Sequence, residues 1–159
     1  MKQKLYIMCG LPFSGKTTLA KKISQQTGAE YIASDDLHDA SLPKIERWGA
    51  AIDLMKTRVE QTLKEGRGVV CDNGNYRKSQ RDELYGMARE MGAETVVIFL
   101  DLPTEILRQR SEENTSRPGV AEETFARHET QIEIPTDNEG VVVRLKSEGE
   151  IQAFDVSVL

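Results

Sequence analysis

A short run near the amino terminus, GLPFSGKTT, combines residue types that proteins use to bind phosphate. Its two glycines are five positions apart, and a lysine and a threonine follow the second one, which is the spacing G-x-x-x-x-G-K-[ST]. Glycines in such a loop let successive backbone N–H groups turn toward an anion, and the positive end of a following helix adds to the attraction. The residues that would form this binding loop are Gly10, Leu11, Pro12, Phe13, Ser14, Gly15, Lys16, Thr17 and Thr18.

Two side chains of the loop would carry its chemistry. Lys16 is expected to reach the β and γ phosphates of a nucleotide, and the Thr17 hydroxyl is expected to ligate Mg²⁺. The flanking sequence supports this interpretation, because residues 4–9 predict a buried strand before the loop and residues 16–27 predict a helix after it. The alternative is a glycine-rich turn that matches the motif by chance. The motif therefore predicts a site for ATP and Mg²⁺, with Lys16 also acting in catalysis.

A further acidic position ends another predicted strand, residues 68–72. A carboxylate at the end of a strand beside the first one can hold Mg²⁺ through water, as the second acidic element of nucleotide-binding proteins does. The sequence DNGN, which begins at Asp72, also has the composition of a turn, and a purely structural role there is the alternative. Asp72 is thus the second predicted metal residue, beside Thr17.

Three acids gather after the strand predicted at residues 30–34, in the stretch SDDLHD. Ligands bind beyond the carboxyl ends of the strands in open parallel sheets. A carboxylate there can take a proton from an acceptor hydroxyl, and we expect Asp35 to be that general base. The alternative is helix capping, with Ser34 as the N-cap and the acids in the first turn. Both roles are compatible if Asp36 or Asp39 serves the helix.

A polar segment at about residues 111–120 contains proline and glycine and predicts a mobile surface lid. Arg110 precedes this segment and Arg117 lies within it. An arginine on a closing segment would neutralise the charge of a transferring phosphoryl group and exclude water. We therefore expect Arg117 to act in catalysis and Arg110 to contact the nucleotide. The alternative is a solvated helix face, on which Glu112 and Glu113 pair with these arginines.

Strands and helices alternate along the chain. Short apolar runs predict strands at residues 4–9, 30–34, 68–72, 94–101 and 141–145. Helical periodicity predicts helices at residues 16–27, 44–65, 77–92, 103–110 and 121–132. This alternation implies an α/β fold with a mostly parallel sheet covered by helices on both sides. Trp48 and Met55 lie on the apolar stripe of the helix at 44–65 and are interpreted as core, and His128 is interpreted as an ordinary helix residue.

The composition limits the class of protein. At 159 residues the chain suits one domain, residues 1–159, with a single core. The formal net charge of −5 disfavours a protein that binds the phosphates of long nucleic acids, so we expect no nucleic-acid partner. The two cysteines are too few for a disulfide framework, and no apolar run reaches the length of a membrane span. We therefore expect a cytoplasmic protein without a membrane partner; the sequence does not predict its oligomeric state.

Several motifs, taken in order, resemble those of small P-loop kinases. They are GLPFSGKTT, SDD, VVCDNGN with Arg81 nine residues after Asp72, VIFLDLPTEILRQR and VAEETFARHETQIEIPTDNEG. Over about residues 3–145 the chain is similar to the AAA-type ATP-binding kinases related to polynucleotide 5′-hydroxyl kinase, chloramphenicol phosphotransferase and zeta toxin. The resemblance implies a three-layer P-loop fold with the strand order 2-3-1-4-5, Asp35 as general base and a small arginine-bearing lid.

The combined prediction is a kinase that transfers the γ-phosphoryl group of ATP to a hydroxyl group of a small molecule. Among the kinases that the chain resembles, those that phosphorylate polynucleotide ends carry an arginine three residues beyond the base. This chain has His38 at that position. This departure and the negative net charge argue against a polynucleotide acceptor. Two alternatives stay open, namely a polynucleotide 5′-hydroxyl kinase and a nucleotide-binding switch or NTPase that is not a kinase.

Overall fold

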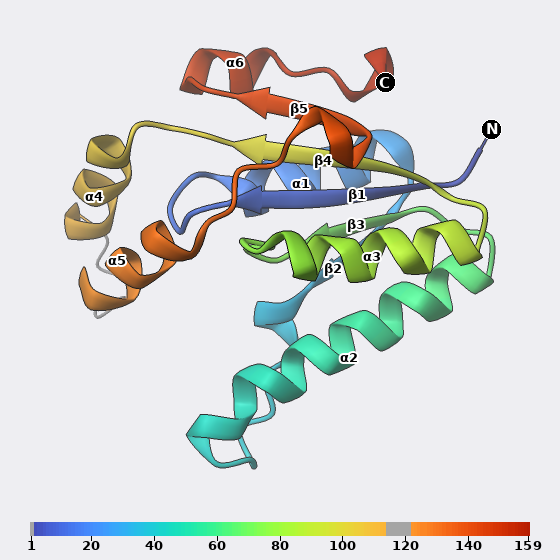
Figure 1. The fold of residues 1–159 in the computed structure, drawn as a ribbon, viewed down its shortest axis with the longest axis horizontal. Helices are drawn as coiled ribbons and strands as arrows, with labels where there is room; N and C mark the ends of the chain where they lie inside the picture. The colour runs from blue at the N-terminus through green and yellow to red at the C-terminus, as the bar shows by residue number, and fades with distance from the viewer. Residues whose placement is uncertain (1, 114–121) are drawn as a thin grey trace.

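A five-stranded sheet forms the centre of the computed structural model, which describes residues 2–113 and 122–159 (Figure 1). Its strand order is β2-β3-β1-β4-β5, and every adjacent pair is parallel. The parallel sheet and the predicted order 2-3-1-4-5 are therefore confirmed. The strands are β1 (Lys4–Gly10), β2 (Glu30–Ala33), β3 (Val69–Asp72), β4 (Glu94–Leu100) and β5 (Val141–Leu145).

Helices cover both faces of this sheet (Figure 1). α2 and α3 pack on one face, and α1 packs on the other face together with the carboxyl-terminal α6 and η3. The helices are α1 (Lys16–Thr27), α2 (Lys44–Lys64), α3 (Lys78–Glu90), α4 (Thr104–Glu113), α5 (Glu122–Gln131) and α6 (Glu148–Ala153). Three short 3₁₀ turns are η1 (Ser34–Leu37), η2 (Asp137–Glu139) and η3 (Val156–Val158).

The central strand β1 shows why the sheet needs helices on both faces. Successive side chains of a strand point to opposite faces, and both sets are apolar here. Leu5, Ile7 and Cys9 belong to the core beneath α2 and α3, whereas Tyr6 and Met8 belong to the core beneath α1. Because all strands are parallel, the segments that follow β1, β2 and β3 emerge at one edge of the sheet.

α4 is longer than the sequence predicts. It continues through Glu113, so residues 111–113 of the predicted lid form its last turn. The Gln109 side-chain nitrogen donates to the Glu113 carboxylate at 3.2 Å across one helical turn. The reason is that arginine, glutamine and glutamate favour helices, whereas the proline and glycine of the segment come later in the sequence. Residues 114–120 of the predicted lid lie outside the described residues.

The carboxyl-terminal α6 was not predicted. Its N-cap is Ser147, whose hydroxyl accepts a hydrogen bond from the Glu150 amide at 3.1 Å. A helix of six residues is too short to show a clear apolar period, and the cap is its main local signal. In the described ranges, no helix is both long and apolar enough to cross a bilayer.

Candidate active site

The loop between β1 and α1 has the shape that phosphate binding requires. A Cβ atom on Gly10 would lie 3.0 Å from the Leu100 carbonyl oxygen and 3.1 Å from the Ser14 hydroxyl, so the close approach of these groups requires glycine. Gly15 has a φ of 91°, in the left-handed region that favours glycine, and it directly precedes α1. The first N–H groups of α1 have no partner within the helix and are therefore available to an anion at the loop.

Lys16 is the first residue of α1, and its side chain bends across the loop. Its Nζ atom donates to the Leu11 carbonyl at 3.0 Å. Ser14 is buried, and its hydroxyl oxygen has no hydrogen-bond partner among the described residues. An ammonium group and a buried hydroxyl at a helix N-terminus form a suitable environment for phosphate oxygens. The loop residues Pro12–Thr18 all line one cavity, whereas Gly10 and Leu11 do not.

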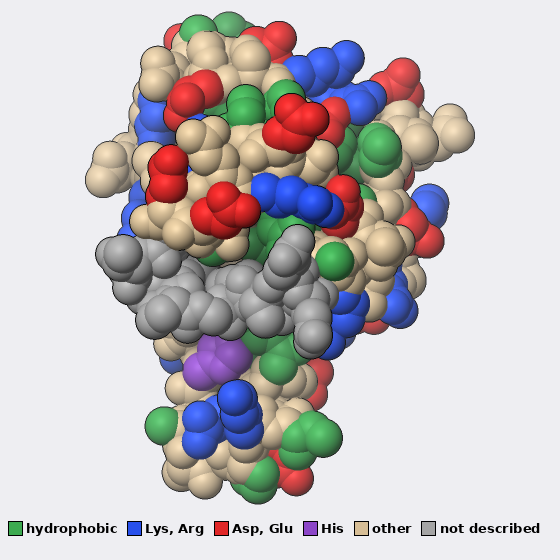
Figure 2. Space-filling model, turned by 90° about the vertical axis from the view of Figure 1, so that its left-hand side faces the viewer, with side chains coloured by type: hydrophobic (Ala, Val, Ile, Leu, Met, Phe, Trp, Pro, Cys, Tyr) green, Lys and Arg blue, Asp and Glu red, His purple; other side chains and the backbone are tan. Residues whose placement is uncertain are grey.

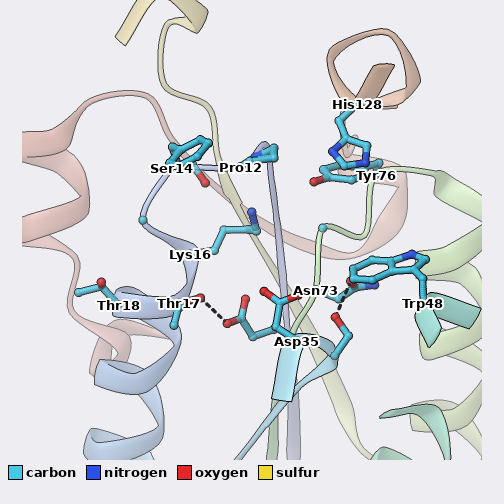
Figure 3. A pocket seen from close by; sticks show the side chains of 15 residues that line it. Pro12, Ser14, Lys16, Thr17, Thr18, Asp35, Trp48, Asn73, Tyr76 and His128 are labelled. Atoms are coloured by element: carbon cyan, nitrogen blue, oxygen red, sulfur yellow. Dashed lines mark hydrogen bonds between the residues drawn. The ribbon is translucent and has the colours of Figure 1, made fainter. Parts of the chain in front are cut away.

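The two predicted metal residues lie against each other. Thr17 Oγ1 donates to Asp72 Oδ2 at 2.8 Å (Figure 3). The Tyr31 hydroxyl donates to the same oxygen at 2.7 Å. Burial, together with the Asp72 carboxylate, raises the pKa of Tyr31, so this hydroxyl stays a neutral donor.

Hydroxyl and carboxylate oxygens suit Mg²⁺, which typically takes one or two protein groups and completes its shell with water and substrate phosphates. The Thr17 and Asp72 oxygens therefore fit this ion. Within the part of the chain that the structure describes, no group of three or more His, Cys, Asp or Glu side chains is arranged to hold a metal. A Mg²⁺ ion at this position would thus depend on the phosphates of a nucleotide for its remaining ligands.

Asp35 lies in η1, directly after β2. β2 pairs with β3, and the Ser34 hydroxyl donates to Asn73 Oδ1 at 3.0 Å, which fixes the two strand ends side by side. The exposed Asp35 side chain lines the same cavity as Lys16 (Figure 3). Ser34 makes no capping hydrogen bond in the turn, so the capping alternative is wrong for this residue. The neighbouring Asp36 is also exposed but does not line the cavity.

One cavity of about 360 Å³ joins the loop to the predicted base. Figure 3 shows Thr17 and Thr18 on one side, Trp48, Tyr76 and His128 on the other, and Asp35 and Asn73 between them. Beyond the loop, the lining residues come from η1, α2, the end of β3, the segment after it and α5. They are Ser34, Asp35, Trp48, Asp72, Asn73, Gly74, Tyr76 and His128. The cavity therefore has a loop side and an aromatic side.

The aromatic side was missed from the sequence. Trp48 was interpreted as core, but it is 49% exposed and its ring lies 5.3 Å from that of His38, centroid to centroid. Met55 is core as predicted. His128 is more than an ordinary helix residue, because it lines the cavity and its ring packs 4.7 Å from that of Tyr76. Helical periodicity places Trp48 on the apolar stripe of α2 but cannot say whether that part of the stripe is covered.

His128 is held as a neutral imidazole. Its pKa is lowered, first by burial and then by the positive charges of Arg127 and Lys16. Its Nδ1 atom is buried and has no hydrogen-bond partner among the described residues. Lys16 and His128 line the same cavity, so the loop and the aromatic side both border this space (Figure 3).

Arg81 supports the backbone that carries Tyr76. It is fully buried, and its Nε and Nη2 atoms donate to the Glu139 carboxylate at 2.8 and 3.2 Å. Its Nη1 atom donates to the carbonyls of Asn75 and Tyr76 at 2.8 and 3.2 Å, and Nη2 also donates to the Glu133 carbonyl at 2.8 Å. The segment after β3 and the segment before β5 are thus tied together by one guanidinium group.

Of the two arginines predicted to act at the lid, the structure describes Arg110 but not Arg117. Arg110 does not line the cavity; its Nη1 atom donates to the Phe13 carbonyl in the loop at 3.0 Å, and its Nη2 atom donates to Glu148 at 2.8 Å. Its guanidinium group therefore contacts the loop backbone. Arg117 lies outside the described residues.

A parallel sheet in the order 2-3-1-4-5, with a phosphate-binding loop between β1 and α1, defines a small P-loop kinase by class. A family model described as an AAA domain matches residues 5–134, and the chain belongs to that family. A probable gluconokinase from Schizosaccharomyces pombe is 28% identical over 96% of this chain and 86% of that relative.

Two further comparisons agree with this class. An L-seryl-tRNA(Sec) kinase from Methanococcus maripaludis is 30% identical over 67% of this chain but only 44% of its own length. The crystal structure of Kti12 from Chaetomium thermophilum in complex with ADP-AlF3 has a TM-score of 0.71 and 20% identity, over 93% of both chains. At that identity the structural likeness establishes the fold alone. Family, fold and relatives together make the protein an ATP-dependent phosphotransferase.

Proposed function

We propose that this kinase transfers the γ-phosphoryl group of ATP to a hydroxyl group of a small acceptor molecule. The observation that carries the proposal is the shared cavity, which both Asp35 and Lys16 line. The loop supplies the nucleotide half of the site. The space between Asp35 and the aromatic side chains of Trp48 and Tyr76 supplies room for the acceptor. Residues 1–159 would act as one kinase domain.

The residues on the two sides of the cavity have separate roles in the transfer. Lys16 neutralises charge on the β and γ phosphates, and Mg²⁺ held by Thr17 and Asp72 would supply further positive charge there. Asp35 takes the proton of the acceptor hydroxyl, and the acceptor oxygen forms a bond to the γ-phosphorus. The bond between that phosphorus and the β–γ bridging oxygen breaks, so the products are ADP and a phosphate ester.

The two arginines enter the proposal differently. Arg110 would support the nucleotide-binding loop through its hydrogen bond to the Phe13 carbonyl. Arg117 would meet the transferring phosphoryl group, and its assignment comes from the sequence alone.

A small acceptor is favoured over a polynucleotide. Ligand cavities in proteins typically measure about 300–1,000 Å³, and the present one, at about 360 Å³, lies at the lower end of that range. The net charge of −5 also disfavours a chain of phosphates as ligand. One relative, which matches along 86% of its own length, is named a probable gluconokinase. A nucleotide-binding switch, in turn, would have no need of a carboxylate beside an acceptor space.

The test compares two neighbouring carboxylates. ATP consumption is screened against open-chain polyols, sugars, sugar acids, nucleosides, aromatic alcohols and oligonucleotides with free 5′ ends. With the best acceptor, Asp35→Asn should lower the transfer rate about 10²–10⁴-fold while nucleotide affinity stays nearly unchanged, because only the proton acceptor is lost. Asp36→Asn is the matched control, since this residue is also exposed but does not line the cavity.

Three results would contradict the proposal. Equal transfer rates for wild type and Asp35→Asn would show that Asp35 is not the base. A loss of ATP affinity in Asp35→Asn as large as its loss of transfer rate would assign Asp35 to nucleotide or metal binding. ATP hydrolysis without transfer to any acceptor would favour the switch.

A further inference from the structure

We infer that the acceptor is a neutral, polyhydroxylated ring, either a free monosaccharide or the sugar of a nucleoside. This inference deepens the proposed function and rests on it. It follows from three properties of the cavity beyond the loop: its flat aromatic surfaces, the signs of its charges and its uncharged polar groups.

The aromatic surfaces suit the faces of a ring. Trp48 presents an indole that is half exposed at the cavity, and Tyr76 and His128 present a second pair of rings tilted by 31° (Figure 3). An indole combines a large apolar face with a polar N–H group, so a half-exposed tryptophan beside a cavity suits contact with a ligand. A cyclic sugar has apolar C–H faces that pack on such planes, and its rim of hydroxyl groups remains free for hydrogen bonds.

The charges at the cavity disfavour an anionic acceptor. Among the described residues that line it, Lys16 is the sole cation, and it belongs to the phosphate loop. Asp35 carries negative charge on the remaining lining, whereas Asp72 lies against Thr17 on the loop side. His128 adds no positive charge near neutral pH because its pKa is lowered. Arg47, which directly precedes Trp48 in α2, donates to the carbonyls of Leu42 and Ala40 instead. Among the described lining residues, a carboxylate or phosphate on the acceptor would therefore meet the Asp35 carboxylate and no cation besides Lys16.

The polar groups suit hydroxyls. Asn73 offers one end of its amide to Ser34 and leaves the other end at the cavity, and Figure 3 shows the Tyr76 hydroxyl directed toward the loop side. Asp35 provides the acceptor for the hydroxyl that reacts. Neutral donors and acceptors of this kind pair with sugar hydroxyls at little desolvation cost. With the phosphates at the loop, a cavity of about 360 Å³ leaves room for about one ring.

The binding experiment uses the single tryptophan of the chain, since Trp48 fluorescence reports directly on the aromatic side of the cavity. With ATP analogue and Mg²⁺ present, the protein is titrated with matched pairs: glucose and glucuronate, galactose and galacturonate, adenosine and AMP, and open-chain gluconate. Turnover is measured for the same compounds with ATP. We expect a neutral ring to change the Trp48 fluorescence and to be phosphorylated. Its kcat/KM should be at least tenfold above that of its anionic counterpart. A response to sugars identifies a monosaccharide kinase, and a response to adenosine a nucleoside kinase.

A pair of variants on α2 tests the stacking. Trp48→Ala should raise the KM for the neutral ring about tenfold with little change in the KM for ATP, as expected for a lost stacking surface, and Trp48→Phe should restore part of it. Leu54→Ala is the control, because Leu54 is similarly exposed, at 41%, but does not line the cavity.

A preference for glucuronate, galacturonate, AMP or gluconate would overturn the inference, as would the absence of both binding and turnover for every neutral ring. If Asp35-dependent transfer to one of the anions persists, only the inference fails; if transfer is independent of Asp35, the proposed function fails as well.

Discussion

Asp72 connects three elements through one oxygen atom. Its Oδ2 atom accepts hydrogen bonds from Thr17 in α1 and Tyr31 in β2, while its backbone ends β3. The two hydrogen bonds fix the direction of this carboxylate beside the loop. Such an arrangement orients a group that supports a metal through water, and groups of this kind commonly contribute 10–100-fold to metal affinity.

Asp72→Asn should therefore raise the Mg²⁺ concentration needed for half-maximal activity about 10–100-fold. The measurement is a Mg²⁺ titration of the transfer rate at fixed ATP. Tyr31→Phe removes one hydrogen-bond donor to the Asp72 carboxylate but keeps the charge of that carboxylate. The Mg²⁺ concentration needed for half-maximal activity should therefore change much less in Tyr31→Phe. An unchanged Mg²⁺ requirement in Asp72→Asn would leave only the turn role for this residue.

At the scale of elements, the Arg81–Glu139 ion pair joins α3 to η2 and the segment after β3. Both side chains are buried, so each charge depends on its partner and on the surrounding carbonyls and hydroxyls. The Glu139 carboxylate also accepts hydrogen bonds from the Tyr85 hydroxyl at 2.9 Å and the Thr136 amide at 3.0 Å. Removing one member leaves an uncompensated charge in the core.

Arg81→Met should lower the free energy of unfolding by about 3–5 kcal/mol, because it leaves the Glu139 carboxylate buried without its cation. Chemical denaturation measures the loss. Lys78→Met is the control, since the Lys78–Asp82 pair on the same helix is exposed and its loss should change stability only marginally. Similar effects of the two substitutions would show that the buried network does not stabilise this part of the fold.

The same pair predicts an acid dependence. Burial alone would raise the pKa of Glu139, but hydrogen bonds from Arg81, Thr136 and Tyr85 outweigh it and hold this pKa below its ordinary value of 4.5. The unfolded state then binds a proton at higher pH than the folded state, so stability present above pH 4.5 is lost as the pH falls below it. Glu139→Gln should be less stable than wild type at neutral pH, but its free energy of unfolding should fall less on acidification. Denaturant titrations at several pH values measure the free energy of unfolding of both proteins. An equal pH dependence in wild type and Glu139→Gln would show that Glu139 does not cause the loss of stability in acid.

At the scale of the whole molecule, charge decides which acceptors can approach. On the face that Figure 2 shows, Lys and Arg side chains are interspersed with Asp and Glu rather than gathered in a stripe. With a net charge of −5, the chain offers little attraction to a polyphosphate backbone.

Short single-stranded DNA or RNA should therefore bind weakly at physiological salt, with little phosphorylation of 5′ ends. Filter binding across salt concentrations, run beside an end-labelling assay, measures both. Sub-micromolar, salt-sensitive binding with efficient labelling would instead support the polynucleotide kinase alternative.

The sequence by itself determined the nucleotide half of the site. The loop is a run of consecutive residues whose conformation follows from Gly15 and the helix that begins at Lys16, so no distant contact is needed to recognise it. Asp35 and Asp72 follow strands, and parallel strands place their carboxyl ends at one edge, which brought both residues to the loop as predicted. Alternating strands and helices likewise predicted the sheet.

Only the tertiary structure decided the arrangement of the proposed acceptor half. The amino-terminal part of α2 extends beyond the sheet (Figure 1), so one apolar stripe is buried at Met55 yet 49% exposed at Trp48 and 91% exposed at Ile45. Periodicity cannot distinguish these positions, because it reports the side of a helix and not what covers it. Tyr76 and His128 come from segments far apart in the chain and meet only through packing. The surface that would select an acceptor thus depends on contacts between distant residues, whereas phosphate recognition is local.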